Sequence, residues 1–154
     1  MAPFFVCDTQ YCCMEQFMMA SKARMFHDEE TLAQILKSRD PLEIKKLGRK
    51  VRNFSSEAWD AGKYLIILNG NFRKFTQNPA LRDYLLSTGE KTLVEASPYD
   101  TIWGVGLSAE DPCVGTPRLW RGENLLGFAL MEVRDEIAKA YANVHLCAEQ
   151  PEIF

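Results

Sequence analysis

The sequence predicts a mainly α, compact single-domain protein with a small β element. Its 154 residues are the length of one typical domain and suffice to bury a hydrophobic core. Apolar side chains recur at helical spacing in most segments, and no low-complexity linker, internal repeat or shift in composition divides the chain. We therefore expect one domain over residues 1–154, with its core at about residues 3–142 and a loose tail at residues 149–154.

The first half of the chain predicts a short β element followed by helices. Residues 3–13 alternate weakly and are rich in aromatic and β-branched side chains, which is typical of a strand or hairpin. Asp40 followed by Pro41 is a typical helix start, and Ser55 with Ser56 forms the cap expected before a long helix. Apolar periodicity predicts helices at residues 13–26, 29–38, 42–51 and 57–75.

The second half predicts less regular structure. Residues 80–87 follow an Asn-Pro pair and precede Gly89, which is typical of a short helix with a glycine cap at its end. The segment TLVEA at residues 92–96 predicts a short strand. Residues 97–122 form a long loop rich in Gly and Pro, and a loop of this length in a compact domain is often functional. The last predicted helix covers residues 123–142.

Composition excludes several classes of protein. The net charge of -3 provides no global basic field for nucleic acid, which argues against an extended duplex-binding surface and leaves only local contacts. Five irregularly spaced cysteines predict reduced, buried thiols rather than a disulfide framework or a zinc site. No apolar run has the length of a membrane span, and the first residues lack the features of a signal peptide. We expect a cytoplasmic protein with no metal, no cofactor, no membrane contact and no stable protein partner.

The stretch MEQFMMASKA, residues 14–23, carries Glu15 and Lys22 on the apolar face of a predicted helix. Seven residues are nearly two turns, so the two side chains point the same way about 10 Å apart along the axis. In one interpretation both are solvated charges beside a core stripe. In the other they line a pocket, where a desolvated Lys is a nucleophile and a carboxylate stabilises positive charge on a sugar ring. The spacing leaves both interpretations open.

A second candidate site is LVEASPYDTIWGVGL, residues 93–107. Glu95 and Asp100 precede Trp103, and a carboxylate beside an indole suits a flat base or a sugar. Gly104 would let the main chain approach a ligand closely. The alternative is an ordinary loop around a core Trp, and GVG is too short to indicate a dinucleotide-binding fingerprint.

Two further features are candidates for substrate binding. Arg49 lies in a compact basic cluster and has the geometry to hold a phosphate, although such lysine-rich segments are commonly solvated helix faces. Asn124 stands at a predicted helix start, where it either caps the helix or reaches into a pocket.

Together these motifs resemble the YbiA-like family, also called NADAR. The resemblance covers roughly residues 3–136 and depends on the joint occurrence of several motifs in the family's order. They are Glu15 and Lys22 in MEQFMMASKA, LGR at 47–49, Phe54, Trp59, GN at 70–71, KF at 74–75, QNP at 77–79, LLSTG at 85–89, LVEASPYDTIWGVGL at 93–107, NLLGFALM at 124–131 and Arg134.

The resemblance implies a compact, mainly helical YbiA-like fold and N-glycosidase activity without a metal. Two substrate classes are associated with the family: ADP-ribose attached to guanine in nucleic acids or nucleotides, and ribosylamino-pyrimidine intermediates of riboflavin biosynthesis. We expect the first class and keep the second as the alternative, since the sequence does not separate them. The acidic charge of the chain favours a small nucleotide or an unpaired strand over duplex nucleic acid as the substrate. The family's acidic and lysine positions fall on Glu15 and Lys22, which favours the pocket interpretation.

The remaining family positions divide into catalytic and binding roles. With Lys22 and Glu15, Asp100 is an expected catalytic residue, and the expected substrate-binding residues are Arg49, Glu95, Trp103, Gly104 and Asn124. Family members usually carry a further stretch before the first strand, with a Phe-Ser-Asn-Phe or Ser-Gln-Trp motif, whereas this chain starts at MAPFF. We therefore also consider a module that binds ADP-ribose without cleaving it, and a regulatory protein with a vestigial pocket.

Overall fold

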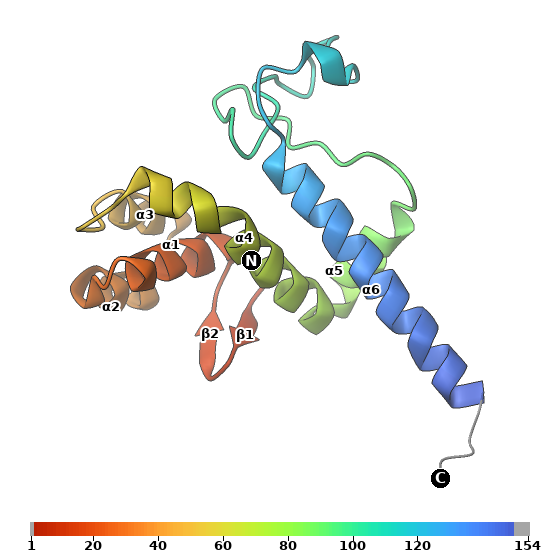
Figure 1. Cartoon of the computed structure of the whole chain (residues 1–154), viewed down its shortest axis with the longest axis horizontal. Coiled ribbons are helices and arrows are strands. Elements are labelled where there is room, and N and C mark those ends of the chain that lie inside the picture. Colours follow the sequence, from red (N-terminus) through yellow and green to blue (C-terminus); the bar gives the residue numbers. More distant parts are fainter. Residues whose placement is uncertain (1, 150–154) are drawn as a thin grey trace. The chain divides into compact units, whose positions relative to one another are not determined.

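The computed structural model describes the main chain of residues 2–149 and the side chains of residues 2–143 (Figure 1). Its elements are six α-helices, one short 3-10 helix and a two-stranded sheet within that described part. The mainly α composition with a small β element, which the sequence predicts, is confirmed. Contacts divide the chain into two compact units, Met1–Pro79 and Ala80–Phe154, and each is described by itself.

The first unit begins with the predicted hairpin. Strands β1 (Phe4–Val6) and β2 (Thr9–Tyr11) are antiparallel, with Phe4 opposite Tyr11. The turn between them contains Cys7 in the left-handed region, at φ 49°. The rings of Phe4 and Tyr11 meet Phe17 with centroid separations of 5.8 and 5.1 Å, and this aromatic cluster ties the hairpin to the first helix.

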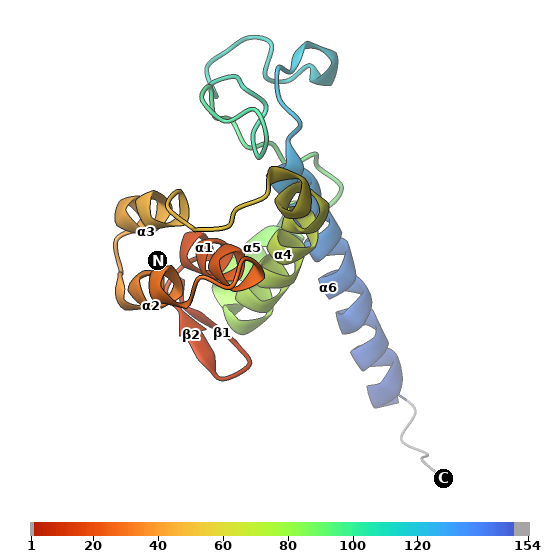
Figure 2. The same cartoon turned by 60° about the vertical axis from the view of Figure 1, so that its left-hand side comes forward.

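Four helices complete the first unit: α1 (Met14–Met25), α2 (Glu29–Lys37), α3 (Pro41–Gly48) and α4 (Ser56–Gln77). Helix α1 packs against the other three, and Figure 2 shows it between α2 and α4. The side chains of Asp28, Asp40 and Ser55 accept hydrogen bonds from the first turns of α2, α3 and α4. Helix ends with such acceptors are stabilised by about 1 kcal/mol each, which explains why the sequence predicts these starts well.

Helix α3 ends three residues earlier than the prediction of residues 42–51. Arg49 is its C-terminal cap, and the amide of Lys50 bonds the carbonyl of Leu47 at 2.8 Å, which tightens the last turn. Val51 leaves the helix because its side chain is buried in the core, 6% exposed. The apolar residue that extended the predicted helix therefore belongs to the loop between α3 and α4.

The second unit contains α5 (Pro79–Ser87), the 3-10 helix η1 (Pro117–Leu119) and α6 (Leu125–Glu149). The predicted glycine cap of α5 is confirmed, because Gly89 has φ 54° and its amide bonds the carbonyl of Leu86. Arg134 of α6 donates to the Thr88 hydroxyl at 3.0 Å and to the Lys91 carbonyl at 2.8 Å. These bonds fasten the chain after α5 to α6, and Figure 1 shows the long loop beyond the first turn of α6.

The predicted strand at residues 92–96 is wrong. This segment has no neighbouring strand among the described residues, and its main chain is bonded instead to the Asn124 side chain and to Val105. Helix α6 also starts two residues later than predicted and continues to Glu149, beyond residue 142. Residue 149 of the predicted tail is therefore helical, and residues 150–154 lie outside the described part.

Two expectations about composition can be compared with this fold. Cys12 is buried, but Cys7 is exposed in the hairpin turn, so the prediction of buried thiols is wrong for Cys7. In the described part of the chain, no helix combines the length and apolarity of a membrane span, and no three metal-binding side chains gather.

Candidate functional site

Lys22 lies in α1 under an aromatic cover. Its Nζ is 4.0 Å from the centroid of the Phe54 ring and 5.9 Å from that of Trp59. Phe26, one turn after Lys22, meets the Phe54 ring edge-on at 5.2 Å between centroids. Because residues four apart share a helix face, Lys22 and Phe26 both face the ring of Phe54.

This cover changes the chemistry of the amine. Burial lowers the pKa of Lys22 from the ordinary 10.5, because the charged form loses hydration. Lys22 is thus neutral more often than a solvated lysine at the same pH, and the neutral amine is the nucleophilic form.

Glu15 lies two turns before Lys22 on the same helix. It is half-buried, and one of its carboxylate oxygens is buried. Between the two residues, Met18 is half-buried and Met19 is buried in the core. Glu15 and Lys22 are thus half-buried and not fully solvated, and a pocket between them stays a prediction.

Arg49 follows α3 and is exposed. Its neighbour Gly48 lies directly against Met19, since a Cβ at position 48 would be 1.9 Å from the Met19 sulfur. The turn that carries Arg49 therefore packs on α1. Arg52 of the same basic cluster is engaged elsewhere, because its guanidinium forms an ion pair with buried Asp28 at 2.7 Å.

The second unit brings Asp100, Trp103, Gly104 and Glu95 together in one wound loop. Asp100 Oδ1 accepts from the amide of Trp103 at 2.8 Å and from that of the preceding residue at 3.1 Å. A Cβ at Gly104 would be 2.7 Å from the Glu95 carbonyl oxygen and 2.9 Å from that of Asp100. Only a glycine fits this approach, so Gly104 lets the two carboxylate-bearing segments lie side by side.

Asn124 holds this loop from the start of α6. It is fully buried, has φ 55°, and its Oδ1 accepts from the Glu95 amide at 3.0 Å. Its Nδ2 donates to the Leu93 carbonyl at 2.9 Å. Both ends of the amide thus bond the main chain around Glu95, so the side chain positions the loop. Direct contact with a substrate stays a prediction for Asn124.

The structure thus places the predicted residues in two groups. Lys22, Glu15 and Arg49 belong to the first unit. Glu95, Asp100, Trp103, Gly104 and Asn124 belong to the second unit.

Sequence reasoning assigned no role to Lys74, although its side chain is half-buried in the first unit. Burial lowers the pKa of Lys74, and interaction with the Cys13 thiol opposes that shift. Its Nζ is 5.4 Å from the Phe75 centroid. The available signal was the motif KF at 74–75, which contributes to the family resemblance.

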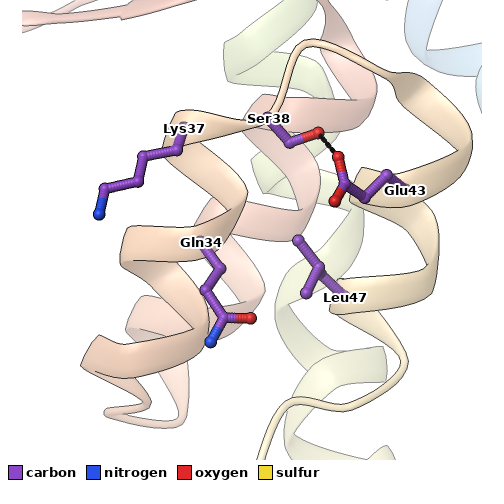
Figure 3. Close-up of a pocket in the computed structure, with 5 residues that line it drawn as sticks. All are labelled: Gln34, Lys37, Ser38, Glu43 and Leu47. Atoms are coloured by element: carbon purple, nitrogen blue, oxygen red, sulfur yellow. Dashed lines mark hydrogen bonds between the residues drawn. The ribbon is translucent and has the colours of Figure 1, made fainter.

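A hollow of about 330 Å³ lies between α2 and α3 (Figure 3). Its wall is polar on one side, where the Ser38 hydroxyl donates to the Glu43 carboxylate. None of the predicted site residues lines it. The lining residues are Gln34, Lys37, Ser38, Glu43 and Leu47.

Comparison with known proteins gives the family. The chain belongs to the NADAR domain family, whose model matches residues 2–138. The resemblance inferred from the motifs is confirmed.

Individual relatives agree with this assignment. N-glycosidase R617 of Acanthamoeba polyphaga mimivirus is 47% identical over 127 residues, which cover 82% of this chain and 75% of that protein. Protein irg-1 of Caenorhabditis elegans is 38% identical over 130 residues, 83% of this chain and 61% of that protein. The NMR structure of the E. coli protein YbiA matches with a TM-score of 0.75 at 27% identity, over 91% of this chain and 75% of that one.

Proposed function

We propose that the protein is an N-glycosidase that hydrolyses a ribose–nitrogen bond, and that it removes ADP-ribose from guanine bases of nucleic acid or nucleotides. Two relatives named N-glycosidases support the activity: R617, and Npun_R5314 of Nostoc punctiforme at 32% identity. The observation that carries the proposal is the Lys22 amine, which is shielded by Phe54 and has a pKa lowered by burial.

Lys22 is the nucleophile in this proposal. Its neutral amine attacks the anomeric carbon of the ribose, and the bond from that carbon to the guanine nitrogen breaks. The electron pair of that bond leaves with guanine, which takes up a proton. The attacking nitrogen passes a proton to the ring oxygen as the bond from that oxygen to the anomeric carbon breaks, and the opened ribose is left as a protonated Schiff base with a free hydroxyl. Water then adds to the Schiff base carbon and releases ADP-ribose and the lysine amine.

Carboxylates assist because departure of the base leaves positive charge on the sugar. A carboxylate near an oxocarbenium-like carbon stabilises that charge. We assign this role to Glu15 or Asp100. Asp100 keeps Oδ2 available for it, since Oδ1 alone accepts the hydrogen bonds from the described main chain.

The other predicted residues bind the substrate. Trp103 is half-exposed and stacks on a base or ribose, and Arg49 holds a phosphate of the ADP-ribose. Glu95 and Gly104 form the wall of the loop that Asn124 holds in place. Each step draws on side chains and water, so the proposal includes no metal or cofactor.

The test is incubation of the whole chain with a single-stranded oligonucleotide that carries ADP-ribosylated guanine, followed by mass spectrometry. We expect loss of the ADP-ribose mass with the parent protein and none with Lys22→Ala. Lys22→Arg is the matched control, because it keeps a long cationic side chain without a nucleophilic amine. Borohydride added during turnover should trap a sugar adduct on Lys22, and turnover without an adduct would exclude the covalent step.

The alternatives make different predictions in the same assay. A ribosylamino-pyrimidine hydrolase would leave the oligonucleotide intact and cleave the riboflavin-pathway intermediate. A binding module would bind ADP-ribose saturably, with Lys22→Ala unaffected and no turnover by the parent. Absence of both turnover and binding would contradict all three.

A further inference from the structure

The loop between α3 and α4 carries Phe54. Asp28, which precedes α2, holds this loop in place. Asp28 is 1% exposed, and its carboxylate accepts from the Arg52 amide at 2.9 Å. The Arg52 guanidinium adds bonds from Nη2 at 2.7 Å and from Nε at 3.2 Å, both to Oδ1. The Thr31 hydroxyl and amide fill the remaining acceptor positions at 2.7 and 3.2 Å.

This arrangement keeps Asp28 charged and fixed. The bonds from the Arg52 side chain, followed by that from its amide, hold the pKa of Asp28 well below its ordinary range. A buried carboxylate with so many donors has one orientation, because any rotation would leave a charged oxygen unsatisfied. The main chain at Arg52 is therefore held at a defined position against the start of α2.

Phe54 lies between two such anchors. Arg52 is bonded to Asp28 two residues before it, and Ser55 immediately after it caps α4 through a 3.3 Å bond from Ala58. Asn53 between them adopts φ 56°, in the left-handed region of the backbone. The ring of Phe54 is 45% exposed, so burial of the ring itself accounts for only part of its placement.

We propose that the ion pair of Asp28 with Arg52 is a positioning device for the reaction, which holds Phe54 over Lys22 and thereby maintains the shielding of the nucleophilic amine. This inference rests on the proposed function for the role of Lys22. The inference depends on three contacts in series. The Asp28 carboxylate fixes Arg52, and Arg52 fixes the loop between α3 and α4. The Phe54 ring of that loop then lies with its centroid 4.0 Å from the Lys22 Nζ. One short segment, residues 22–28, provides the nucleophile, the Phe26 ring against Phe54, and the anchor.

Ion pairs engage some of the other charged side chains on the surrounding elements. On α4, Lys63 pairs with Asp60 at 2.7 Å, and on α2, Glu30 adds a 3.2 Å contact to Arg52. Glu15 lies two turns away on α1. The shift of Lys22 has burial as its cause, so removal of the cover should be visible directly in the titration of this amine.

The experiment is competitive acetylation of the whole folded chain across a pH series, with the Lys22 peptide quantified by mass spectrometry. N-acetyl-lysine amide in the same reaction provides the standard for an unshielded amine. In the parent protein we expect the Lys22 labelling midpoint below that of the standard. Phe54→Ala should move the midpoint up toward the standard, whereas Phe54→Leu, which retains an apolar cover, should keep it low.

Arg52 variants test the anchor. Arg52→Ala, and to a smaller extent Arg52→Lys, should raise the Lys22 midpoint in the same direction as Phe54→Ala. Glu30→Gln is the matched control, because it removes only the exposed partner of Arg52 and should leave the midpoint unchanged. Circular dichroism establishes that each variant is folded, and Arg52→Lys carries the test of the anchor if Arg52→Ala does not fold.

Two outcomes would overturn the positioning role. One is an unchanged midpoint in Phe54→Ala, and the other is an unchanged midpoint in both folded Arg52 variants. Labelling needs no substrate, so it is independent of whether the oligonucleotide is cleaved. Failure of the N-glycosidase proposal would show as no turnover by the parent protein with the labelling shifts intact.

Discussion

The surroundings of Lys22 and the loop around Asp100 are built in different ways. Lys22 is placed by regular helices, and side chains from a neighbouring loop and α4 cover it. Asp100 is placed by main-chain hydrogen bonds in a segment without strands, wound against the start of α6. Around Lys22, burial sets the pKa of the amine. Around Asp100, hydrogen bonds from main-chain amides set the position of the carboxylate.

This difference predicts how each region tolerates substitution. Changes at Lys22 or its cover should alter reactivity with little effect on folding, because the Phe54 ring is part-exposed and Lys22 is only half-buried. Changes at the residues that wind the loop should alter stability, because buried main-chain groups would lose their partners.

The largest expected effect is that of Lys22→Met on turnover. The variant keeps an unbranched apolar side chain but removes the nucleophile, and we expect a loss of at least about 1,000-fold in kcat. Because a half-buried amine is removed, thermal stability should be equal to that of the parent or higher. A variant that loses activity and stability together would contradict the separation of the two regions.

Substitutions of Asp100 should separate the effect of its charge on turnover from its effect on the geometry of the loop. Asp100→Asn keeps an oxygen for the amides of Ile102 and Trp103, so the turn should persist while kcat falls by about 100-fold through loss of charge stabilisation. Asp100→Ala removes the turn as well and should also lower the melting temperature. Equal activity in Asp100→Asn and the parent would remove Asp100 from the reaction.

Asn124→Ala should destabilise the second unit by about 2–3 kcal/mol, because it leaves the Glu95 amide and the Leu93 carbonyl without their partners. Denaturant unfolding followed by circular dichroism measures this loss. Asn124→Gly is the control, since it loses the same bonds but tolerates φ 55° and should be less destabilised than the alanine variant.

The pH dependence of turnover should reflect the amine of the first region. The reaction requires neutral Lys22, so activity should fall as pH decreases through its pKa. Burial lowers that pKa, and the acid side of the kcat profile should therefore lie below the ordinary lysine value of 10.5. The profile is measured on the whole chain under saturating substrate, and Phe54→Ala should displace its acid side toward higher pH.

The smallest expected effect is at Gly89, outside both regions. The Cβ added by Gly89→Ala would have no atom within 4 Å. The loss in free energy of unfolding is therefore only the strain of φ 54°, about 1 kcal/mol. Thermal denaturation should show a small decrease in melting temperature with unchanged kcat. A change in kcat would mean that the cap of α5 influences the reaction.

Local signals in the sequence predicted much of the fold. Asp40 with Pro41, and Ser55 before α4, mark helix starts because a side-chain acceptor close to the first turn satisfies its amides. The failed strand at 92–96 shows the limit of such signals. Its β-branched residues are compatible with an extended chain, but only a partner 29 residues away, Asn124, decides what pairs with its main chain.

In the candidate site, too, local signals in the sequence indicate some residues, and only the fold relates others. The motifs indicated Lys22, Asp100 and Trp103 as candidates because the residue types and their order can be recognised in the sequence. The anchor at Asp28 was not predictable, because its bonds to Arg52 join positions 24 residues apart that no periodicity relates.

By itself, the sequence determined the helical class, the family and the residue types that the chemistry needs. Helix periodicity and capping depend on residues a few positions apart, so the local sequence is enough to predict them. Only the tertiary structure decided that Phe54 covers Lys22 and that Asn124 holds Glu95. Those contacts depend on burial and on how distant segments pack, and the free energy of such packing belongs to the folded chain as a whole.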